Sequence, residues 1–325
     1  MKIKNADPVC KVAFIGAGYM SSEHAKAFGS ITGVQLAGIY SRTRAQAEGL
    51  KKSMQIQRVC DSVHQLYEET RADLVVVSVP ELATYDVCMD AFRFPWTILV
   101  EKPVGFDLRN ALDIYDLALK ADAKVFVALN RRQYQSTKTV LQDLNSHETG
   151  VRLVEVFDQE DMVSALSAGQ PEVVVKNWMY ANSIHIIDYL NIYCRGKIVD
   201  IENIIRWNPA DPFIVSAKVT YDSGDIGLYR GIWNAPAPWS VSVTTKDRRW
   251  ELRPLETGYI QDYGSRAAIK LPDSEVDLAY KPGLKVQAEE AIIAARGQES
   301  NLCTLSESIE LMKLIAKIYQ MDTNE

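Results

Sequence analysis

The chain has 325 residues, of which 47% are hydrophobic and 24% charged, a composition typical of globular proteins. This length predicts about two domains, with enough chain to bury a sizeable core. The net charge of -6 and the isoelectric point of about 5.4 exclude the basic surface with which proteins bind nucleic acid or an anionic membrane. We therefore expect neither nucleic acid nor a membrane as a partner.

The five cysteines are scattered, and no two of them form a CxxC pair: Cys10, Cys60, Cys88, Cys194 and Cys303. This spacing argues against a disulfide framework and against a zinc site, so no metal is expected. The basic start Met1–Lys4 resembles a signal peptide, but Asn5, Asp7 and Pro8 interrupt it, and the next apolar run, Val12–Ile15, is short. No stretch approaches the ~20 apolar residues that span a bilayer. We therefore expect a cytoplasmic protein.

Short apolar runs alternate with segments of helical length over the first 130 residues. The expected strands are Lys11–Ile15, Val34–Tyr40, Arg58–Cys60, Leu74–Ser78, Thr97–Val100 and Val125–Ala128. The expected helices are Ser21–Ser30, Arg44–Ser53, Val63–Glu69, Tyr85–Phe92 and Asn110–Ala121. Continuous apolar runs are what parallel strands buried on both faces require. The pattern predicts an α/β domain over residues 1–130, with a doubly wound parallel sheet.

Residues 131–325 show a different pattern, a run of strands with three segments of helical length, as in a sheet with helices on one face. The expected strands are Val151–Gln159, Val199–Arg206, Phe213–Tyr221, Ile226–Ile232, Ser240–Thr245 and Arg248–Arg253. Residues 221–225 and Asp247 are turn signals between them. The expected helices are Ser183–Tyr193, Leu284–Ala295 and Ser306–Tyr319, and Leu255–Gly283 is expected to be a long loop. The second domain is therefore predicted to be α+β, with an open, largely antiparallel sheet.

A glycine-rich turn follows the first predicted strand, in the sequence Gly16-Ala17-Gly18-Tyr19-Met20-Ser21. Gly16 permits a tight turn, and Gly18 lets the backbone approach a pyrophosphate at the N-terminus of the next helix. Ser21 takes the place of the third glycine and is small enough for close helix–strand packing. The alternative is a turn without a ligand, but its place in a βαβ unit favours a dinucleotide.

The end of the second strand bears on the choice between NAD and NADP. A carboxylate there would hold the ribose 2′-hydroxyl of NAD, but the sequence continues Ser41-Arg42-Thr43-Arg44. Ser41 and Arg42 are able to receive the 2′-phosphate of NADP, because a guanidinium pairs well with phosphate. The alternative is that Arg42 stacks on adenine. The expected cofactor is NAD or NADP, with NADP favoured.

Two further motifs carry chemistry at chain positions typical of a ligand site. Glu101-Lys102-Pro103 follows the fifth strand, where strand ends face the ligand crevice of such a sheet. Pro103 is a candidate for a cis peptide bond. His185 and Asp188 are three residues apart in a predicted helix, so they share a face. Each motif alone also fits a surface turn or a packed core histidine.

The ordered set of these motifs resembles the glucose–fructose oxidoreductase and inositol dehydrogenase (Gfo/Idh/MocA) family. The resemblance extends to Ser78-Val79-Pro80, to Asn130-Arg131-Arg132 and to Gly196, and it covers nearly the whole chain. It implies an N-terminal Rossmann domain that binds NAD or NADP and a C-terminal domain that binds substrate. It also implies an oxidoreductase that transfers a hydride to or from an alcohol carbon of a sugar, cyclitol or sugar nucleotide. In the family the outer face of the C-terminal sheet commonly forms the dimer contact, so a homodimer or homotetramer is expected.

The resemblance assigns roles to individual residues. The cofactor would be bound by Gly16, Gly18, Tyr19, Met20, Ser41, Arg42, Val79, Pro80, Glu101 and Lys102. Lys102 and His185 would be the catalytic pair and would also contact the substrate. Arg132, Trp178 and Tyr180 are further substrate-binding candidates, for which packing roles are an equal alternative.

The sequence also departs from the family pattern. Many members have an aspartate four residues before the histidine, where this chain has Ala181, and a glycine where it has Ser183. Glu81 and Thr84 replace the Asn and His often found after the Pro80 motif. These changes leave two alternatives to the dehydrogenase. One is a sensor that binds the dinucleotide without turnover, and the other is an NAD-dependent lyase or hydrolase with internal redox cycling.

Overall fold

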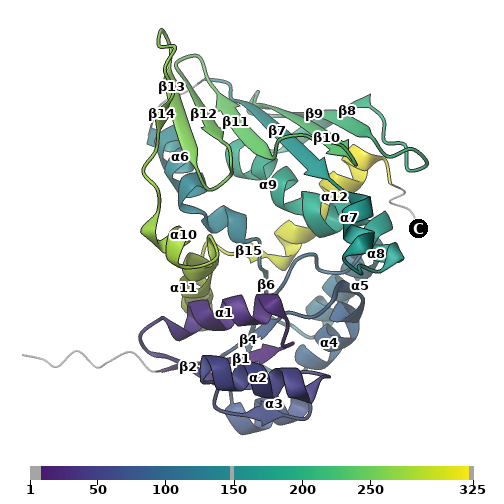
Figure 1. Ribbon diagram of the computed structural model, residues 1–325, viewed down its shortest axis with the longest axis vertical. Coiled ribbons are helices and arrows are strands. Elements are labelled where there is room, and N and C mark those ends of the chain that lie inside the picture. The colour runs from purple at the N-terminus through teal and green to yellow at the C-terminus, as the bar shows by residue number, and fades with distance from the viewer. Residues whose placement is uncertain (1–8, 147–149, 322–325) are drawn as a thin grey trace, which may run out of the picture. The chain divides into compact units, whose positions relative to one another are not determined.

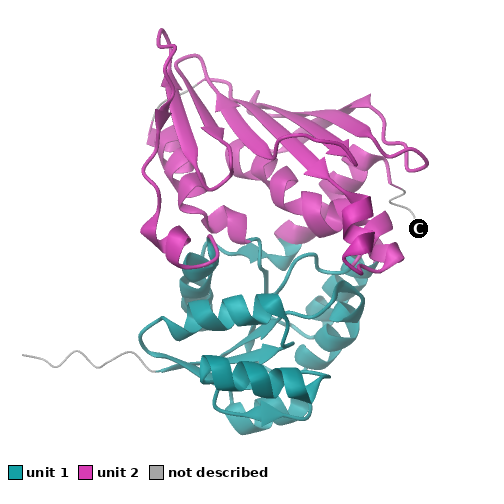
Figure 2. Cartoon of the chain, viewed as in Figure 1, with its two compact units in different colours: residues 1–105, 110–129, 283–306 teal, residues 106–109, 130–282, 307–325 magenta. Residues whose placement is uncertain are grey.

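The computed structural model describes residues 9–146 and 150–321 and divides them into two compact units (Figure 2). Unit 1 comprises the described residues up to Gly105, together with Asn110–Leu129 and Gly283–Ser306. Unit 2 comprises Phe106–Arg109, Asn130–Pro282 and the described residues from Glu307 onward. Each unit has its own sheet, and each is described by itself below.

Unit 1 is a seven-stranded sheet in the order β15-β6-β5-β4-β1-β2-β3 (Figure 1). Its strands are β1 Cys10–Ile15, β2 Val34–Tyr40, β3 Val59–Cys60, β4 Leu74–Val77, β5 Thr97–Val100, β6 Val125–Val127 and β15 Cys303–Thr304. The strands β1 to β6 pair in parallel, and β15 runs antiparallel to β6. Every residue of β4 and β5 is buried, as expected for strands covered on both faces. The predicted doubly wound α/β domain is confirmed.

The helices of unit 1 connect these strands. They are α1 Tyr19–Gly29, α2 Arg44–Met54, α3 Val63–Thr70, the short η1 Glu81–Ala83, α4 Thr84–Ala91, α5 Leu108–Lys120 and α11 Leu284–Ala295. The sequence analysis grouped α11 and β15 with residues 131–325. In the structure both belong to unit 1, because α11 buries Leu284, Ala288 and Ile292 in the same core as Phe28 of α1.

Unit 2 is an eight-stranded sheet in the order β14-β13-β12-β11-β7-β10-β9-β8. Its strands are β7 Leu153–Glu160, β8 Ile198–Ile205, β9 Ile214–Tyr221, β10 Ile226–Trp233, β11 Ser240–Thr244, β12 Arg248–Leu252, β13 Gly258–Asp262 and β14 Ile269–Lys270. Among the described strand pairs of this sheet, only β7 and β10 are parallel. The predicted largely antiparallel sheet is confirmed, including both predicted turns.

The helices of unit 2 cover one face of this sheet in Figure 1. They are η2 Asn130–Gln133, α6 Gln135–Ser146, α7 Met162–Ser167, α8 Glu172–Lys176, the π-turn η3 Met179–Ser183, α9 Ile184–Tyr193, α10 Glu275–Ala279 and α12 Leu305–Tyr319. Along β9 the side chains of Val215, Ala217 and Val219 are buried on the helix side. Phe213, which we expected to begin this strand, precedes it and is 55% exposed.

The predicted loop Leu255–Gly283 is wrong, because it contains β13, β14 and α10. These elements are two to five residues long, and the segment that contains them has several Gly, Pro, Ser and Asp residues. Backbone pairing with β12 orders β13, whereas hydrophobic periodicity needs a longer segment to be visible. Helix α6 was also missed by the sequence analysis.

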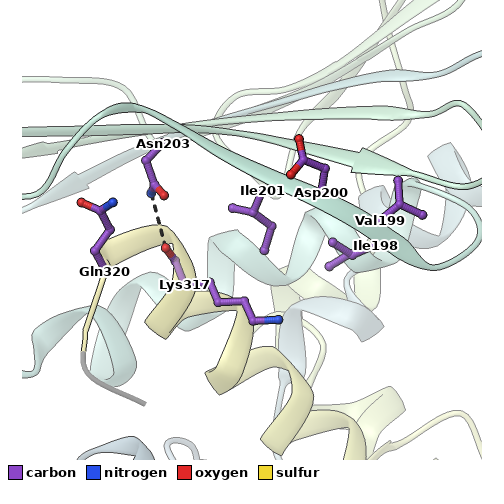
Figure 3. A pocket seen from close by; sticks show the side chains of 7 residues that line it. All are labelled: Ile198, Val199, Asp200, Ile201, Asn203, Lys317 and Gln320. Carbon is purple, nitrogen blue, oxygen red and sulfur yellow. Dashed lines mark hydrogen bonds between the residues drawn. The ribbon is translucent and has the colours of Figure 1, made fainter. Parts of the chain in front are cut away.

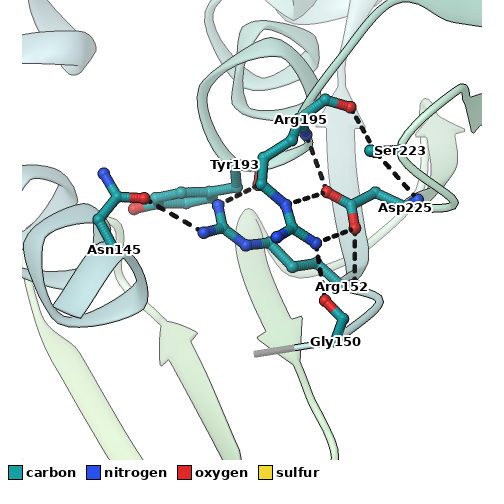
Figure 4. A network of polar contacts seen from close by, with 7 residues as sticks. All are labelled: Asn145, Gly150, Arg152, Tyr193, Arg195, Ser223 and Asp225. Atoms are coloured by element: carbon teal, nitrogen blue, oxygen red, sulfur yellow. Dashed lines mark hydrogen bonds and ion pairs between the residues drawn. The ribbon is translucent and has the colours of Figure 1, made fainter. Parts of the chain in front are cut away.

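A buried carboxylate joins three segments at one end of the unit 2 sheet (Figure 4). Asp225, which directly precedes β10 in the β9–β10 hairpin, has no exposed surface. It accepts hydrogen bonds from the backbone N–H groups of Arg152 and Arg195, both at 2.8 Å, and from the Arg195 guanidinium at 2.8 and 2.9 Å. Burial opposes its ionisation, but the hydrogen bonds from Arg195 and Arg152 still lower the pKa of Asp225. The carboxylate thereby fixes the chain that leaves α9 to the start of β7.

Candidate functional site

The glycine-rich turn lies at the carboxyl end of β1, next to the carboxyl end of β4. Neighbouring strands connect in opposite directions from this point, because β1 leads toward β2 and β3, and β4 leads toward β5 and β6. In open α/β sheets the ligand crevice lies at such a switch point. Gly16 has a φ of +107°, and an added Cβ would lie 1.9 Å from the Ser78 carbonyl oxygen. The fold itself therefore requires glycine at position 16.

In the described structure, neither backbone conformation nor packing requires glycine at position 18. Its φ is -82°, which any residue adopts, and an added Cβ would meet no atom within 4 Å. Gly18 precedes the first residue of α1, and no side chain caps that helix end or places an acid in its first turn. The free N–H groups of a helix N-terminus attract a phosphate. An exposed glycine at an uncapped helix start therefore fits the pyrophosphate of a dinucleotide, with Tyr19 and Met20 beginning the helix.

At the end of β2 two arginines have different surroundings. The side chain of Arg44 pairs with Asp61, and it also lies 3.5 Å from Glu48. Arg42 is exposed, and across residues 9–146 and 150–321 its side chain has no hydrogen bond or ion pair. The half-buried Ser41 accepts a hydrogen bond from the Thr43 N–H at 3.3 Å. Arg42 is therefore the available cation on this loop.

The Glu-Lys-Pro motif follows β5 on the same edge of the sheet. Val79 and Pro80 follow β4 on that edge, and the Val79 side chain is 3.3 Å from the Cβ position of Gly16. Lys102 is half-buried, and its peptide bond to Pro103 is cis. The structure thus gathers the predicted cofactor residues of unit 1 along one sheet edge.

His24 is a neighbour of this motif that the sequence analysis missed. It lies on α1 and is 1% exposed, and its Nε2 is 2.7 Å from Oε1 of Glu101. The second carboxylate oxygen of Glu101 accepts a hydrogen bond from the Lys102 N–H at 3.2 Å. Glu101 therefore connects the helix after the glycine turn with the backbone of Lys102. The three-residue spacing of Ser21 and His24 on an apolar helix face was the available signal.

In unit 2, Arg132 is engaged by protein carboxylates. Its Nε and Nη2 donate to the two carboxylate oxygens of Asp188 at 2.7 and 2.8 Å, and its Nη1 donates to Glu307 at 3.2 Å. Asp188 lies on α9, one turn after His185. The forked pair therefore fixes α9 to η2, and this use of the guanidinium favours the packing alternative for Arg132.

The other predicted substrate residues lie in or beside the π-turn that leads into α9. Trp178 precedes the turn and is half-buried, whereas Tyr180 within it is 2% exposed. Burial and then the Asp107 carboxylate raise the pKa of Tyr180, so its hydroxyl is neutral. His185 is the second residue of α9 and is 8% exposed. Single π-turns within helices are frequent at functional sites.

A pocket in unit 2 is lined by none of the predicted site residues (Figure 3). It has a volume of about 470 Å³ between β8 and α12, and it is lined by Ile198, Val199, Asp200, Ile201, Asn203, Lys317 and Gln320.

Within the described ranges, no group of three His, Cys, Asp or Glu side chains is arranged to hold a metal, and all five cysteines are free and buried. None of the helices described is both long and apolar enough to cross a membrane.

Comparison with known proteins identifies unit 1. The Gfo/Idh/MocA model, described as an oxidoreductase family with an NAD-binding Rossmann fold, matches residues 10–129. These residues belong to that family. The predicted resemblance is confirmed over these residues, which include the glycine turn and the Glu-Lys-Pro motif.

Individual relatives are distant. Glucose-6-phosphate 3-dehydrogenase of Bacillus subtilis is 25% identical over 134 residues, which are 41% of this chain and 37% of that protein. The chain thus spans about a third of the length of the curated relatives that it matches.

Two solved structures share the fold of this chain over nearly its whole length. A candidate NADPH-dependent oxidoreductase from Desulfitobacterium hafniense has a TM-score of 0.80 at 18% identity and covers 97% of this chain and 96% of its own. UDP-N-acetylglucosamine 3-dehydrogenase from Acidithiobacillus ferrooxidans has a TM-score of 0.74 at 16% identity and covers 95% and 96%. At this identity they show a common fold.

The two glycines of the turn give a matched pair of variants. We expect Gly18→Ala to unfold at the wild-type temperature. We expect it to bind NADP⁺ about 10–100-fold more weakly, because the added methyl group would keep the phosphate from one backbone N–H and so remove one charge-assisted hydrogen bond. We expect Gly16→Ala to cost about 1–3 kcal/mol of stability, because its backbone conformation is strained for alanine. Thermal unfolding and a fluorescence titration with NADP⁺ measure the two effects. Unchanged affinity in Gly18→Ala would mean that no ligand approaches this turn.

Proposed function

We propose that this protein is an NAD(P)-dependent dehydrogenase or reductase that acts on an alcohol or keto carbon. The observation that carries the proposal is the common sheet edge of unit 1. The open glycine at the start of α1, the free Arg42 after β2 and Lys102 after β5 all follow the carboxyl ends of parallel strands. A dinucleotide laid along that edge would contact all three regions.

The reaction moves a hydride and a proton, which need separate acceptors. The nicotinamide supplies the hydride acceptor or donor when it is bound. Lys102 would polarise the substrate oxygen or transfer its proton, and His185 would be the acid or base partner, since imidazole titrates near neutral pH. Glu101 would hold the backbone of Lys102 through the hydrogen bond given above.

The proposed substrate class is a sugar, cyclitol or sugar nucleotide. Relatives named as glucose-6-phosphate 3-dehydrogenase and UDP-N-acetylglucosamine 3-dehydrogenase support it. Trp178 is the aromatic residue with surface to stack on the apolar face of a sugar ring. Tyr180 and Arg132 are proposed only as supports of the substrate site, because one is buried and the other is paired.

We further propose NADP as the preferred cofactor, and Arg42 tests it. Arg42→Ala should weaken NADP⁺ binding about 10–100-fold and leave NAD⁺ nearly unchanged, because only NADP⁺ has the 2′-phosphate. Arg44→Ala is the matched control, since Arg44 is paired with Asp61 and should affect neither cofactor strongly. Titration of both cofactors against both variants measures the difference. An equal loss for NAD⁺ and NADP⁺ in Arg42→Ala would indicate adenine stacking and contradict the NADP assignment.

The catalytic assignment predicts a selective loss of the chemical step. Lys102→Met and His185→Ala should each lower hydride transfer by roughly 10²–10⁴-fold, the usual contribution of a positioned acid or base. Cofactor affinity should stay within a few-fold, because neither residue is expected to hold the pyrophosphate.

Single-turnover reduction of NADP⁺ measures this loss. The probes are glucose 6-phosphate, UDP-N-acetylglucosamine and myo-inositol, and Lys313→Met is the control at an exposed lysine outside the site. Wild-type rates in both site variants would show that Lys102 and His185 are structural. Cofactor reduction without turnover would favour the sensor, for which the loss of a carboxylate at Ala181 is the supporting observation.

We also propose that the protein is a homodimer or larger oligomer through the outer face of the unit 2 sheet. Half-buried apolar side chains alternate there with the buried ones, namely Leu153, Phe157, Ile214, Leu228 and Ile232. A sheet with helices on one side leaves such a face to be covered. Sedimentation equilibrium should show a dimer at micromolar concentration and a monomer for Leu228→Glu. A wild-type monomer would contradict the proposal.

A further inference from the structure

Strand β7 carries two acids on its core face. Its side chains alternate between half-buried and buried positions, and the buried ones are Val154, Val156, Asp158 and Glu160. Asp158 is 0% exposed and Glu160 is 1% exposed. Burying a carboxyl group is costly unless it is hydrogen-bonded, so the partners of these two groups define their role.

Besides each other, the two acids have different partners. Asp158 accepts hydrogen bonds from the Tyr229 hydroxyl at 2.7 Å and from the Trp239 indole. Glu160 accepts two from the Asn182 amide, at 2.9 and 3.2 Å, and one from the Ser183 hydroxyl at 3.2 Å. Asp158 is thus tied to the sheet, whereas Glu160 is tied to the π-turn.

Burial and the closeness of the two acids disfavour a negative charge on Glu160. Burial first, and then the neighbouring Asp158 carboxylate, raise the pKa of Glu160 well above its ordinary value, so Glu160 keeps its proton at neutral pH. The other titratable groups packed against the pair are the hydroxyls of Tyr229 on β10 and Tyr319 on α12, which lie 2.7 Å apart. Burial also raises the pKa of both tyrosines, so they remain neutral.

The two residues held by Glu160 immediately precede the helix of His185. Asn182 and Ser183 end the π-turn, α9 begins at Ile184, and His185 follows. Asn182 and His185 are three residues apart in the chain, so Glu160 binds the segment that directly precedes the histidine. Ala181, where relatives of this chain often have a carboxylate, is 4% exposed and offers only a methyl group. A carboxyl group therefore does reach this turn, but it comes from β7.

We propose that Glu160 is a positioning residue for His185. Its buried carboxyl group holds Asn182 and Ser183, and through them it sets the orientation and the titration of the imidazole. This inference rests on the proposed function of His185 in the reaction, but its first test does not need the reaction.

The first test is ¹⁵N NMR of the histidine rings in the full-length protein without cofactor. The sequence has four histidines, so the His185 signal is assigned by its loss in His185→Gln. Glu160→Leu removes the acceptor, and we expect it to shift the His185 titration midpoint by about one pH unit. Glu160→Gln keeps an acceptor of the same shape, and it should restore the wild-type midpoint. The signals of His24 and His64 in unit 1 should not move.

Each result of this test decides the proposal. An unchanged His185 midpoint in Glu160→Leu, or an equal shift in Glu160→Gln, would overturn it. If Glu160→Leu does not fold, Asn182→Ala removes the same link at a half-buried position and must produce the shift. Asp143→Asn is the control for a carboxylate of unit 2 that binds Arg248 and Trp250 instead, and it should leave His185 unchanged.

The second test measures turnover with whichever of the three sugar probes the wild-type protein oxidises. Glu160→Leu should lower kcat about tenfold or more while the Kd for NADP⁺ stays the same, and Glu160→Gln should retain wild-type kcat. A fall in folded yield with unchanged kcat per folded protein would mean a merely structural role and overturn the proposal. The proposed function fails separately, if Lys102→Met and His185→Ala leave hydride transfer unchanged while the His185 midpoint still responds to Glu160.

Discussion

The Asp225 carboxylate, with no surface exposed to solvent, constrains the part of the chain that carries His185. It binds Arg195, which follows α9, and the backbone of Arg152, which precedes β7. At the other end of the same helix Glu160 of β7 binds Ser183. Helix α9 is therefore held at both ends by buried carboxyl groups. Asp225 links its C-terminal end to the residue before β7, and Glu160, which lies on β7, binds its N-terminal end. The forked pair of Arg132 with Asp188 fixes the middle of the helix to η2.

The charge states of these carboxyl groups differ because their partners differ. Asp225 faces a guanidinium and two backbone N–H groups, which favour the ionised form. Burial and then the neighbouring Asp158 carboxylate raise the pKa of Glu160 and favour its neutral form, although the hydrogen bonds from Asn182 and Ser183 act in the opposite direction. One end of α9 is thus held by an ion pair and the other by a neutral acid. Only the neutral end adjoins the imidazole, where an additional full charge would change the titration of His185.

Much of the fold was accessible from the sequence because of how parallel strands are buried. The runs at Leu74–Val77 and Thr97–Val100 are apolar at every position, and both were found as strands with nearly the observed bounds. The helices Arg44–Met54 and Leu284–Ala295 were also located closely. The short elements between Leu255 and Gly283 were not found, because partner strands rather than local patterns order them. The membership of α11 in unit 1 depends on packing between segments that are more than 200 residues apart, which no local pattern records.

The site was predictable where backbone geometry demands a residue type, and less so where side chains meet. Glycine at positions 16 and 18 was visible, although only the structure separates the one required by Ser78 from the one open to a ligand. Arg132 was a candidate for substrate binding, but its guanidinium donates hydrogen bonds to Asp188. Glu160 was missed, although the sequence contains a signal for it. Alternate residues of a strand share one face, and the face that begins with the apolar Val154 and Val156 continues with Asp158 and Glu160. An acid on the buried face of a strand needs a partner, and that partner belongs to the turn before His185.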